Sequence, residues 1–387
     1  MKKKSLGELC DIVSGGTPSR SHIEYWDKGS IPWIKIGNIK GKYVSTSDEY
    51  ITQAGLDGSS AKMLPKGTLL YTIFATLGEV GILTIEACTN QAIAGISIKH
   101  NDEISTDFLY YYLKSKKSYV NKIGRGVAQN NINMSMLRAL EVPVPNIAEQ
   151  SRIVSVLDSV ASVVTIRQQQ LEKLDELVKA RFVEMFGMPG TDTKGWGLQY
   201  LGTCCELNPK KGTDKRLVSG LSVSFVPMPA VSESGKIDAS QIKAYDEVKT
   251  GFTYFAENDV LFAKITPCME NGKGAVAVGL CNNIGFGSTE FHILRPINNK
   301  SNPYWLYSLT SFDAFRKDAA DNMTGSAGQR RVPAVFLEKY KVTLPPIELQ
   351  NQFAAFVEQT DKSKVAVQKS LDEAQLLFDS LMQQYFG

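Results

Sequence analysis

Two long segments of the chain carry apolar residues at alternating spacings of four and three positions, with polar residues between them. Apolar positions repeated in this way over several heptads are typical of a coiled coil. We therefore predict two long helices, over residues 146–187 and 347–387, that pair with each other. The predicted core positions are Ile153, Leu157, Val160, Val164, Leu171, Leu174 and Val178 in the first helix, and Phe353, Val357, Val367, Leu371, Phe378 and Leu381 in the second.

The local sequence marks the start of the first predicted helix. Pro143 and Pro145 precede it, and proline favours extended backbone and cannot continue a helix. Asn146 follows as a favourable N-cap, with Glu149 three residues later, as in a capping box. The alternative is that both segments are ordinary core helices of one large α/β domain. The heptad spacing recurs in both segments, however, and each ends at a Phe-Gly pair.

The remaining segments, residues 1–145 and 188–346, have the pattern of mixed α/β domains. Short runs of β-branched and aromatic residues, bounded by glycine, proline or asparagine, predict strands. Such runs lie at residues 33–36, 69–73, 78–83 and 274–278, and residues 110–113 and the region around Trp305 suit short amphipathic helices.

The chain also contains an internal repeat. Residues 123–187 align with residues 323–387 without a gap, and the two halves diverge most at residues 19–62 and 214–254. The matched pairs include Leu6 with Leu201, Cys10 with Cys205, Gln129 with Gln329, Pro145 with Pro345, Gln150 with Gln350 and Leu171 with Leu371. The sequence therefore predicts an α+β protein with a pseudo-two-fold repeat. In it, two mixed α/β domains stand in tandem, and each is followed by a long helix.

Composition and charge restrict the classes of function. The hydrophobic fraction of 43% is typical of globular proteins, and no apolar run reaches the ~18 residues that a membrane-spanning helix needs. The six cysteines show no CxxC spacing, so we expect reduced thiols in a cytoplasmic protein. The net charge of +3 permits DNA binding, but a small protein that grips DNA alone is usually more basic. We therefore expect another molecule to supply part of the electrostatic attraction.

The sequence offers no recognisable catalytic or metal-binding motif. His22, His100 and His292 are scattered without an HExxH pattern, and neither a GxSxG elbow nor a phosphate-binding P-loop occurs. The run that begins Asn302-Pro303 is similar to the loop with which amino-methyltransferases hold a target adenine, but its second proline is missing. We interpret Asn302 as the N-cap of a helix. We expect no catalytic residue, no metal and no cofactor on this chain.

Several short segments occur in a distinctive order. In the first half they lie at residues 6–8, 14–19, 31–39 and 75–81, and hinges at residues 129–150 and 325–350 lead into the two helices. In this order, and with two heptad helices, the chain resembles the specificity subunit of a Type I restriction-modification system over essentially its whole length. The second half departs from the family pattern at Lys210-Lys211-Gly212-Thr213 and has no sequence counterpart of Trp33-Ile34-Lys35-Ile36-Gly37. We therefore expect the two domains to contact DNA through loops that are not equivalent.

The resemblance implies a function and partners. The two α/β domains would be target-recognition domains, each of which reads one half of a bipartite, asymmetric site in double-stranded DNA. Two methyltransferase subunits would dock on the helices and make N6-methyladenine with S-adenosylmethionine. Two restriction subunits that translocate and cut DNA, using ATP and Mg²⁺, could join them. The chain itself would be a non-catalytic subunit in the cytoplasm of a prokaryote.

The duplication indicates where DNA bases would be read. If the halves read different sequences, the shared residues cannot discriminate between bases, so base-reading residues should lie where the copies diverge. Lysine and arginine pair with guanine edges, and asparagine pairs with adenine. The predicted DNA contacts are Thr17, Ser19, Arg20, Lys35, Asn38 and Lys40 in the first half, and Lys210, Lys211, Lys215, Arg216 and Lys264 in the second. Lys42 is a further candidate base reader in the divergent segment of the first half. The polar, glycine-containing hinges add Arg125, Gln129, Asn130, Ser326, Gln329, Arg330 and Arg331.

Other interpretations remain open at this point. Any one of these lysines can be explained as a solvated loop residue, although the clusters favour DNA. A specificity subunit of a related restriction class would carry the same features. A self-sufficient DNA methyltransferase or nuclease is disfavoured by the missing cofactor and metal motifs, and a tandem-repeat adaptor would leave the basic divergent segments unexplained.

Overall fold

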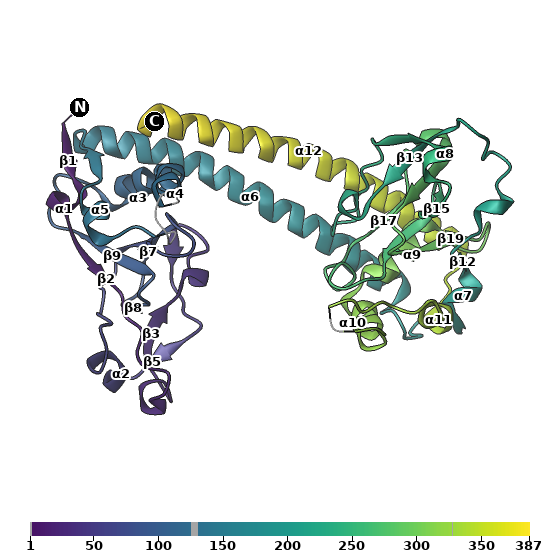
Figure 1. Cartoon of the computed structure of the whole chain (residues 1–387), viewed down its shortest axis with the longest axis horizontal. Helices are drawn as coiled ribbons and strands as arrows, with labels where there is room; N and C mark the ends of the chain where they lie inside the picture. The colour runs from purple at the N-terminus through teal and green to yellow at the C-terminus, as the bar shows by residue number, and fades with distance from the viewer. Residues whose placement is uncertain (1, 125–130, 327) are drawn as a thin grey trace. The chain divides into compact units, whose positions relative to one another are not determined.

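The computed structural model describes residues 2–124, 131–326 and 328–387 (Figure 1). These residues form two compact units. Unit 1 comprises Met1–Arg167 and Ser370–Gly387, and unit 2 comprises Gln168–Lys369. Each unit thus contains one globular domain and parts of both long helices.

Unit 1 holds the first globular domain. Its elements are β1 (Lys3–Ser5), α1 (Leu6–Leu9), β2 (Cys10–Ser14), η1 (Ile23–Tyr25), β3 (Ile31–Ile34), η2 (Ile36–Asn38), β4 (Tyr43–Val44), β5 (Tyr50–Ile51), α2 (Gln53–Asp57), β6 (Leu69–Thr72), β7 (Val80–Leu83), β8 (Cys88–Thr89), β9 (Ile93–Ile98), α3 (Thr106–Ser115), α4 (Lys117–Gly124), α5 (Met134–Arg138), β10 (Glu141–Pro143), the start of α6 (Ile147–Phe186) and the end of α12 (Ile347–Phe386). The strands form sheets of order β2-β9-β6-β7-β4, β5-β3-β8 and β1-β10.

Unit 2 holds the second globular domain. Its elements are the end of α6, β11 (Leu198–Tyr200), α7 (Leu201–Cys204), β12 (Cys205–Leu207), η3 (Lys211–Thr213), β13 (Ser222–Val226), η4 (Met228–Ala230), β14 (Ile242–Ala244), α8 (Tyr245–Val248), β15 (Thr253–Ala256), β16 (Val260–Ala263), β17 (Gly274–Val276), η5 (Cys281–Asn283), β18 (Ile284–Gly287), β19 (Phe291–Pro296), α9 (Pro303–Ser311), α10 (Asp313–Asp321), α11 (Ala334–Lys339), β20 (Lys341–Thr343) and the start of α12. Its sheets have the orders β12-β19-β16-β17, β14-β13-β18-β15 and β11-β20.

The two domains share most of their topology, although among the described residues β4 of the first and β15 of the second have no counterpart in the other domain. The antiparallel order β2-β9-β6-β7 recurs as β12-β19-β16-β17, and the β1–β10 pair recurs as β11–β20. The sheets that contain β3 and β13 also match in part, because β3 runs parallel to β8 and antiparallel to β5, as β13 does to β18 and β14. The predicted fold class, with its internal repeat, is confirmed. The segment at residues 31–34 has a structural counterpart at residues 222–226, which the sequence comparison did not detect.

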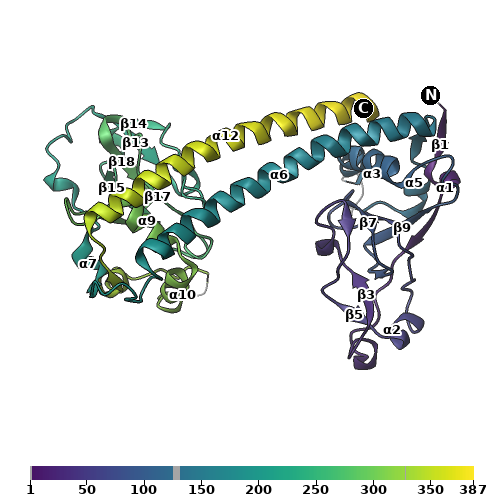
Figure 2. The ribbon, with the colours of Figure 1, turned by 180° about the vertical axis from the view of Figure 1, so that it is seen from behind.

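The sheet that contains β6 in unit 1 and the sheet that contains β16 in unit 2 are each covered by helices that connect them to a long helix. In unit 1, α3 lies between the sheet and α6 (Figures 1 and 2). Its residues Phe108 and Tyr111 are buried together with Ile96 of the sheet and Leu157 of α6. In unit 2, α9 contributes Trp305 and Leu306 to the corresponding core. A single hydrophobic core therefore joins each domain to the helices, which are not independent appendages.

Within each unit, α6 and α12 pack against each other. In unit 1, Ile153 near the start of α6 shares a core with Phe386 at the end of α12. In unit 2, Phe182 at the end of α6 contacts Phe353 near the start of α12, with ring centroids 5.5 Å apart. The helices therefore pair in an antiparallel arrangement. Every predicted core position of both helices is buried or half-buried.

Polar residues that interrupt the apolar stripes have partners of their own. Lys364 on α12 forms an ion pair of 2.7 Å with Asp175 on α6. The hydroxyl of Thr360, which is buried, donates to the carbonyl of Phe356 at 2.9 Å. These interactions compensate for polar groups in the helix interface, because a buried polar group is costly unless it is hydrogen-bonded.

The helix starts follow the local sequence closely. The backbone N–H of Glu149 donates to the side chain of Asn146 at 2.9 Å, so Asn146 caps α6 as expected. The Glu149 carboxylate pairs instead with Arg152, so only one half of the capping box forms. Asn302 caps α9 by accepting from the N–H of Tyr304 at 2.9 Å, which confirms its interpretation as an N-cap. Among the described residues, no helix is long and apolar enough to cross a membrane.

Candidate nucleic-acid interface

The divergent part of the first domain contains a compact ionic and aromatic cluster. Glu49 accepts hydrogen bonds from both Arg20 and Lys35. The Arg20 guanidinium also lies over the Trp26 ring, 3.6 Å from its centroid, and Trp33 lies at the edge of that ring. The two cations hold the pKa of the Glu49 carboxyl below its ordinary value. The structure thus brings together Arg20 and Lys35, two predicted DNA contacts that are distant in sequence.

The other predicted contacts of this domain lie on neighbouring loops. Asn38 accepts from the backbone N–H of Lys35 at 2.8 Å and donates to Asp48 at 2.9 Å, so it orders the turn that carries Lys35. Thr17 and Ser19 are exposed, and Thr17 donates to Gln91. Lys40 is exposed and forms no ion pair within the part of the chain that the structure describes.

Lys42, in the same divergent segment, faces the long helix. Its ammonium group contacts Asp158 of α6 at 2.6 Å and Asp107 of α3 at 2.7 Å. Burial opposes the charged form of Lys42, but the two carboxylates prevail and raise its pKa. Lys42 therefore attaches the end of the loop that carries Lys35 and Asn38 to the α6 helix.

The divergent part of the second domain is built around Asp214. Arg216 binds its carboxylate through two hydrogen bonds of 2.9 and 2.7 Å, and the Tyr254 hydroxyl donates to it at 2.7 Å. These donors, Arg216 first, lower the pKa of Asp214. Lys211 donates to the Lys249 carbonyl at the rim of an open hollow of about 470 Å³. Lys210 and Lys215 are exposed beside it.

The hinge of the second domain is paired with residues 264–266, which follow β16. It also reaches Glu290, in the loop between β18 and β19. Arg331 binds both oxygens of Glu290, at 2.9 and 2.8 Å, and donates to the Gln329 carbonyl at 3.1 Å. Lys264 lies beside this pair, where burial and the charge of Arg331 lower its pKa. Arg330 donates to the carbonyl of Ala320. Ser326 and Gln329 are exposed at the turn.

The corresponding hinge of the first domain is only partly described. Arg125, Gln129 and Asn130 lie outside the described residues. The next residues pair as in the second domain, because Asn131 forms a bridge with Phe74 just as Arg331 does with Ile265. Both hinges are therefore attached to the end of the same central strand, β6 or β16.

Two buried residues that support the second hinge were not singled out from the sequence. Arg316 of α10 donates to the carbonyls of Met269 and Gly272, at 3.0 and 2.8 Å, and so holds the loop after β16. His292 of β19 bonds to the carbonyl of Val332 at 2.8 Å. No sequence signal separated either residue from ordinary core or surface positions, because each acts on a loop that is distant along the chain.

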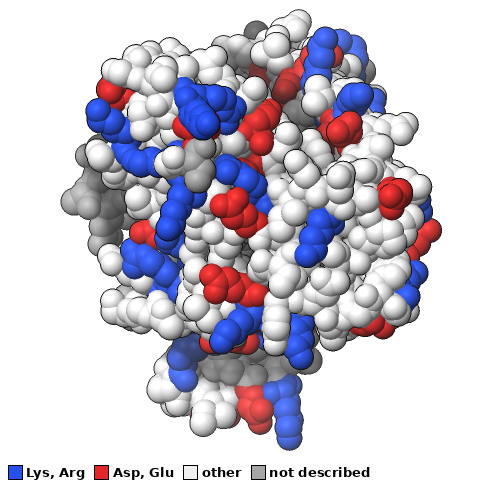
Figure 3. Space-filling model, turned by 90° about the vertical axis from the view of Figure 1, so that its right-hand side faces the viewer, with Lys and Arg blue, Asp and Glu red and all other residues white. Residues whose placement is uncertain are grey.

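Positive charge is not gathered into one continuous patch on the face of the molecule shown in Figure 3. Lys and Arg side chains alternate there with Asp and Glu side chains, in keeping with the near balance of 43 basic and 40 acidic residues. Four predicted contacts, Arg20, Lys35, Arg216 and Arg331, are seen in ion pairs within the described part of the chain. Among the described residues, no group of three or more His, Cys, Asp and Glu side chains is placed to hold a metal ion.

A family model described as Type I restriction modification DNA specificity domain matches residues 1–176 and 220–374. The chain belongs to this family. The resemblance stated from the sequence is confirmed. The two matched segments overlap the two globular domains, in agreement with the repeated strand order described above.

Relatives in this family fall into two groups by coverage. The EcoAI specificity subunit of Escherichia coli is 37% identical over 195 residues, which cover 49% of this chain and 32% of that protein. The EcoEI specificity subunit of the same species is 34% identical over 225 residues, 56% of this chain and 36% of that protein. The chain thus matches about a third of each of these relatives. The MjaIX specificity subunit of Methanocaldococcus jannaschii is 24% identical over 98% of this chain and 91% of that protein.

Solved structures share the fold. The S subunit of a Type I restriction-modification system from M. genitalium has a TM-score of 0.55 and 16% identity, and the match covers 100% of this chain and 96% of that one. A second structure, from work on complex assembly and conformational transition of the Type I system, also has a TM-score of 0.55, at 17% identity. At these identities the likeness shows the fold alone.

Proposed function

We propose that this chain is the DNA-recognition subunit of a Type I restriction-modification complex, and that each globular domain reads one half of a bipartite, asymmetric DNA site. The long helices set the distance between the half-sites and dock two methyltransferase subunits. Those subunits bind S-adenosylmethionine and make N6-methyladenine. Restriction subunits that use ATP and Mg²⁺ join the complex for cleavage, and the chain itself supplies no catalytic group.

One observation carries this proposal: most of the topology is present twice, with different residues around the sheet that contains β3 in one domain and β13 in the other. β3 and β13 occupy the same place between parallel and antiparallel neighbours. Nevertheless, the first domain places Arg20, Lys35 and Trp26 around that sheet, whereas the second places Lys211 and Arg216 there. A scaffold that is conserved between halves and differs in its polar surface is suited to reading two different base sequences, because base contacts specify while scaffold contacts only position.

The outer faces of the helices support the docking part of the proposal. In unit 1, Ile166 of α6 is 50% exposed and Leu376 of α12 is 72% exposed, outside the pairing interface. In unit 2, Val365 of α12 is 68% exposed. Exposed apolar side chains on a helix face are available for contact with another protein.

The proposal is tested by mapping methylated adenines in the genome of a host that expresses this chain with the methyltransferase encoded beside it. We expect a split motif with one N6-methyladenine in each half. A host that expresses the methyltransferase without this chain is the control and should lack the motif. An intact, purified complex that leaves the genome unmethylated would refute the proposal.

A further inference from the structure

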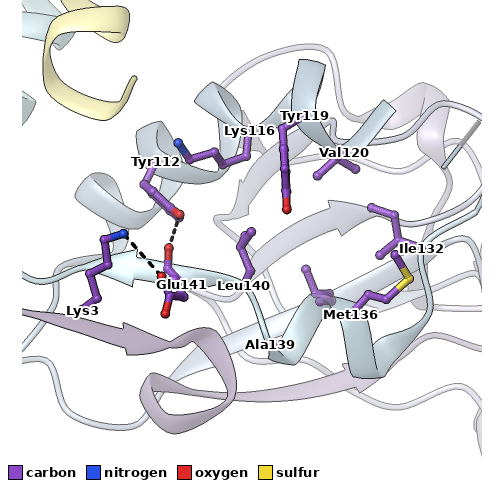
Figure 4. Close-up of a pocket in the computed structure, with 11 residues that line it drawn as sticks. Lys3, Tyr112, Lys116, Tyr119, Val120, Ile132, Met136, Ala139, Leu140 and Glu141 are labelled. Carbon is purple, nitrogen blue, oxygen red and sulfur yellow. Dashed lines mark hydrogen bonds and ion pairs between the residues drawn. The ribbon is translucent and has the colours of Figure 1, made fainter. Parts of the chain in front are cut away.

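Unit 1 contains a hollow of about 600 Å³ beside α4 and α5, which we call the α4–α5 hollow. Figure 4 shows Tyr119 of α4 and Leu140 pointing toward each other across it, with Met136 of α5 at one side. The lining residues are Lys3, Tyr112, Lys116, Tyr119, Val120, Ile132, Met136, Leu137, Ala139, Leu140 and Glu141. The walls are therefore mainly apolar and aromatic, and two lysines and one glutamate stand among them.

The corresponding position in unit 2 shows which side chains can fill such a hollow. Met136 and Leu140 correspond in the gap-free alignment to Phe336 and Tyr340. In unit 2 these two rings and that of Phe315 pack together, with Phe315 4.6 Å from Tyr340 and 6.0 Å from Phe336 between ring centroids. Aromatic rings of the chain itself thus occupy in unit 2 the position that, among the described residues, smaller side chains leave open in unit 1.

The exposure of the aromatic residues on α10 and α4 agrees with a filled position in unit 2 and an open one in unit 1. Phe315 lies on α10, the helix that corresponds to α4, and it is 0% exposed. Tyr119 on α4 is 54% exposed. An aromatic side chain that lines a hollow and stays half in solvent loses packing contacts that an additional ring would restore.

The charges at the rim specify the occupant further. Lys116 donates to the carbonyl of Phe386 at 2.6 Å, and within the described part of the chain no carboxylate forms an ion pair with it. Burial, and then the neighbouring charge of Lys3, lower the pKa of Lys116. Lys3 reaches Glu141 at 3.4 Å, but both side chains of this pair are largely exposed, so the attraction is screened by water. A carboxylate group of a partner at the rim would be attracted by the positive charges of Lys116 and Lys3.

We propose that the α4–α5 hollow docks an aromatic side chain, flanked by a carboxylate, from a protein partner. This inference rests on the proposed function in taking that partner to be the methyltransferase subunit bound to the first half. The filled counterpart in unit 2 accepts no such side chain. The two methyltransferase copies are therefore held differently, and the copy at the first half has an anchor that the other lacks.

The test fills the hollow with the aromatic residues that unit 2 carries at the corresponding positions, Phe336 and Tyr340. The double variant Met136→Phe, Leu140→Tyr is titrated with the methyltransferase subunit by isothermal calorimetry, beside the unsubstituted chain. We expect the affinity of one class of sites to fall about tenfold or more, as for loss of a buried anchor residue, while the other class is unchanged. Ser135→Ala, an exposed position on α5 outside the lining, is the matched control and should bind as the unsubstituted chain does.

A second variant tests the charge at the rim. Lys116→Gln should weaken the same class of sites and reduce the salt dependence of its affinity. Thermal unfolding of each variant checks that the fold is kept. Equal affinity in the filled variant and the unsubstituted chain would overturn the inference while leaving the proposed function intact. A filled variant that unfolds at a lower temperature than the unsubstituted chain would also overturn the inference, because another part of this chain would then occupy the hollow. An unsubstituted chain that binds no methyltransferase would overturn both.

Discussion

Gln150 and Gln350 occupy equivalent positions at the starts of α6 and α12 and make the same three hydrogen bonds. The Gln150 side chain accepts from the N–H of Ser105 at 2.8 Å and donates to the carbonyls of Glu103 and Pro145 at 2.8 and 2.9 Å. Gln350 accepts from the N–H of Asn302 and donates to the two corresponding carbonyls, at 2.8, 3.0 and 2.8 Å. Both side chains are 0% exposed. Each glutamine therefore joins its domain to its helix.

Replacing either glutamine with alanine should destabilise its own unit. One partly buried N–H and two carbonyls would lose their partner, which we expect to cost about 2–4 kcal/mol of the free energy of unfolding. Chemical denaturation followed by circular dichroism measures this cost. Gln352→Ala is the matched control, because Gln352 is exposed on the same helix as Gln350 and should be neutral. An equally small effect at all three positions would contradict the role of the buried pair.

The Glu49→Gln variant tests the cluster of the first domain. Removing the carboxylate frees Arg20 and Lys35, so the complex should bind non-specific DNA more tightly, and its log–log salt slope should become steeper by about 1. The slope is measured from affinities at a series of salt concentrations. Glu24→Gln, which removes an exposed carboxylate paired with His22, is the control and should change less. An unchanged slope at Glu49 would place this cluster away from DNA.

Arg331 remains a predicted DNA contact, although its guanidinium is paired with Glu290 in this structure. Its guanidinium must leave Glu290 to reach a base edge with both donors. We expect Arg331→Ala to weaken specific binding by ~1–3 kcal/mol and to relax recognition at one base pair. Mapped methylation sites measure the relaxation. A change confined to salt dependence would identify a phosphate contact instead, and no change in either would exclude Arg331 from the interface.

His292 gives the second unit a pH dependence of stability. Its buried ring donates to the Val332 carbonyl and accepts from the Asn208 side-chain amide at 3.1 Å, which only the neutral form can do. Burial lowers the pKa of His292 below its ordinary value of 6.5. The unfolded chain therefore takes up the proton first as the pH falls, so the free energy of unfolding decreases below pH 6.5 until the folded pKa is reached.

His292→Gln should remove this part of the pH dependence, because glutamine has no titrating group. Denaturation of both proteins across the acidic range measures the difference. His100→Gln is the control, since His100 is exposed. Parallel pH profiles for His292→Gln and the unsubstituted chain would contradict the role given to His292.

The sequence predicted the long helices well because heptad spacing is a local and regular signal. Asn146, the heptads and the final Phe-Gly pairs located α6 and α12 almost to the residue. The match of β3 with β13 was missed, because strand pairing uses backbone groups and leaves the side chains free to diverge. For the same reason the copies align at the hinges and helices, where side chains pack in a shared core, and not at the sheets that contain β3 and β13.

The candidate site was predictable as a region but not as a set of contacts. The divergent segments were identified from the repeat, but pairs such as Arg20 with Glu49 and Arg331 with Glu290 join residues far apart in sequence. Lys42 lies in the same segment as Lys35 and yet binds Asp158 of the long helix. Which way each lysine turns depends on the tertiary position of a carboxylate, and no local pattern encodes that.

If each globular domain reads its own half of the DNA site, exchanging one domain should change only that half. Residues 1–145 are replaced with the corresponding segment of a family member of different specificity, and methylated adenines are mapped in a host that also expresses the methyltransferase. We predict that one half of the split motif changes, while the other half and the spacing between them stay the same. A motif in which both halves change, or neither does, would contradict the account.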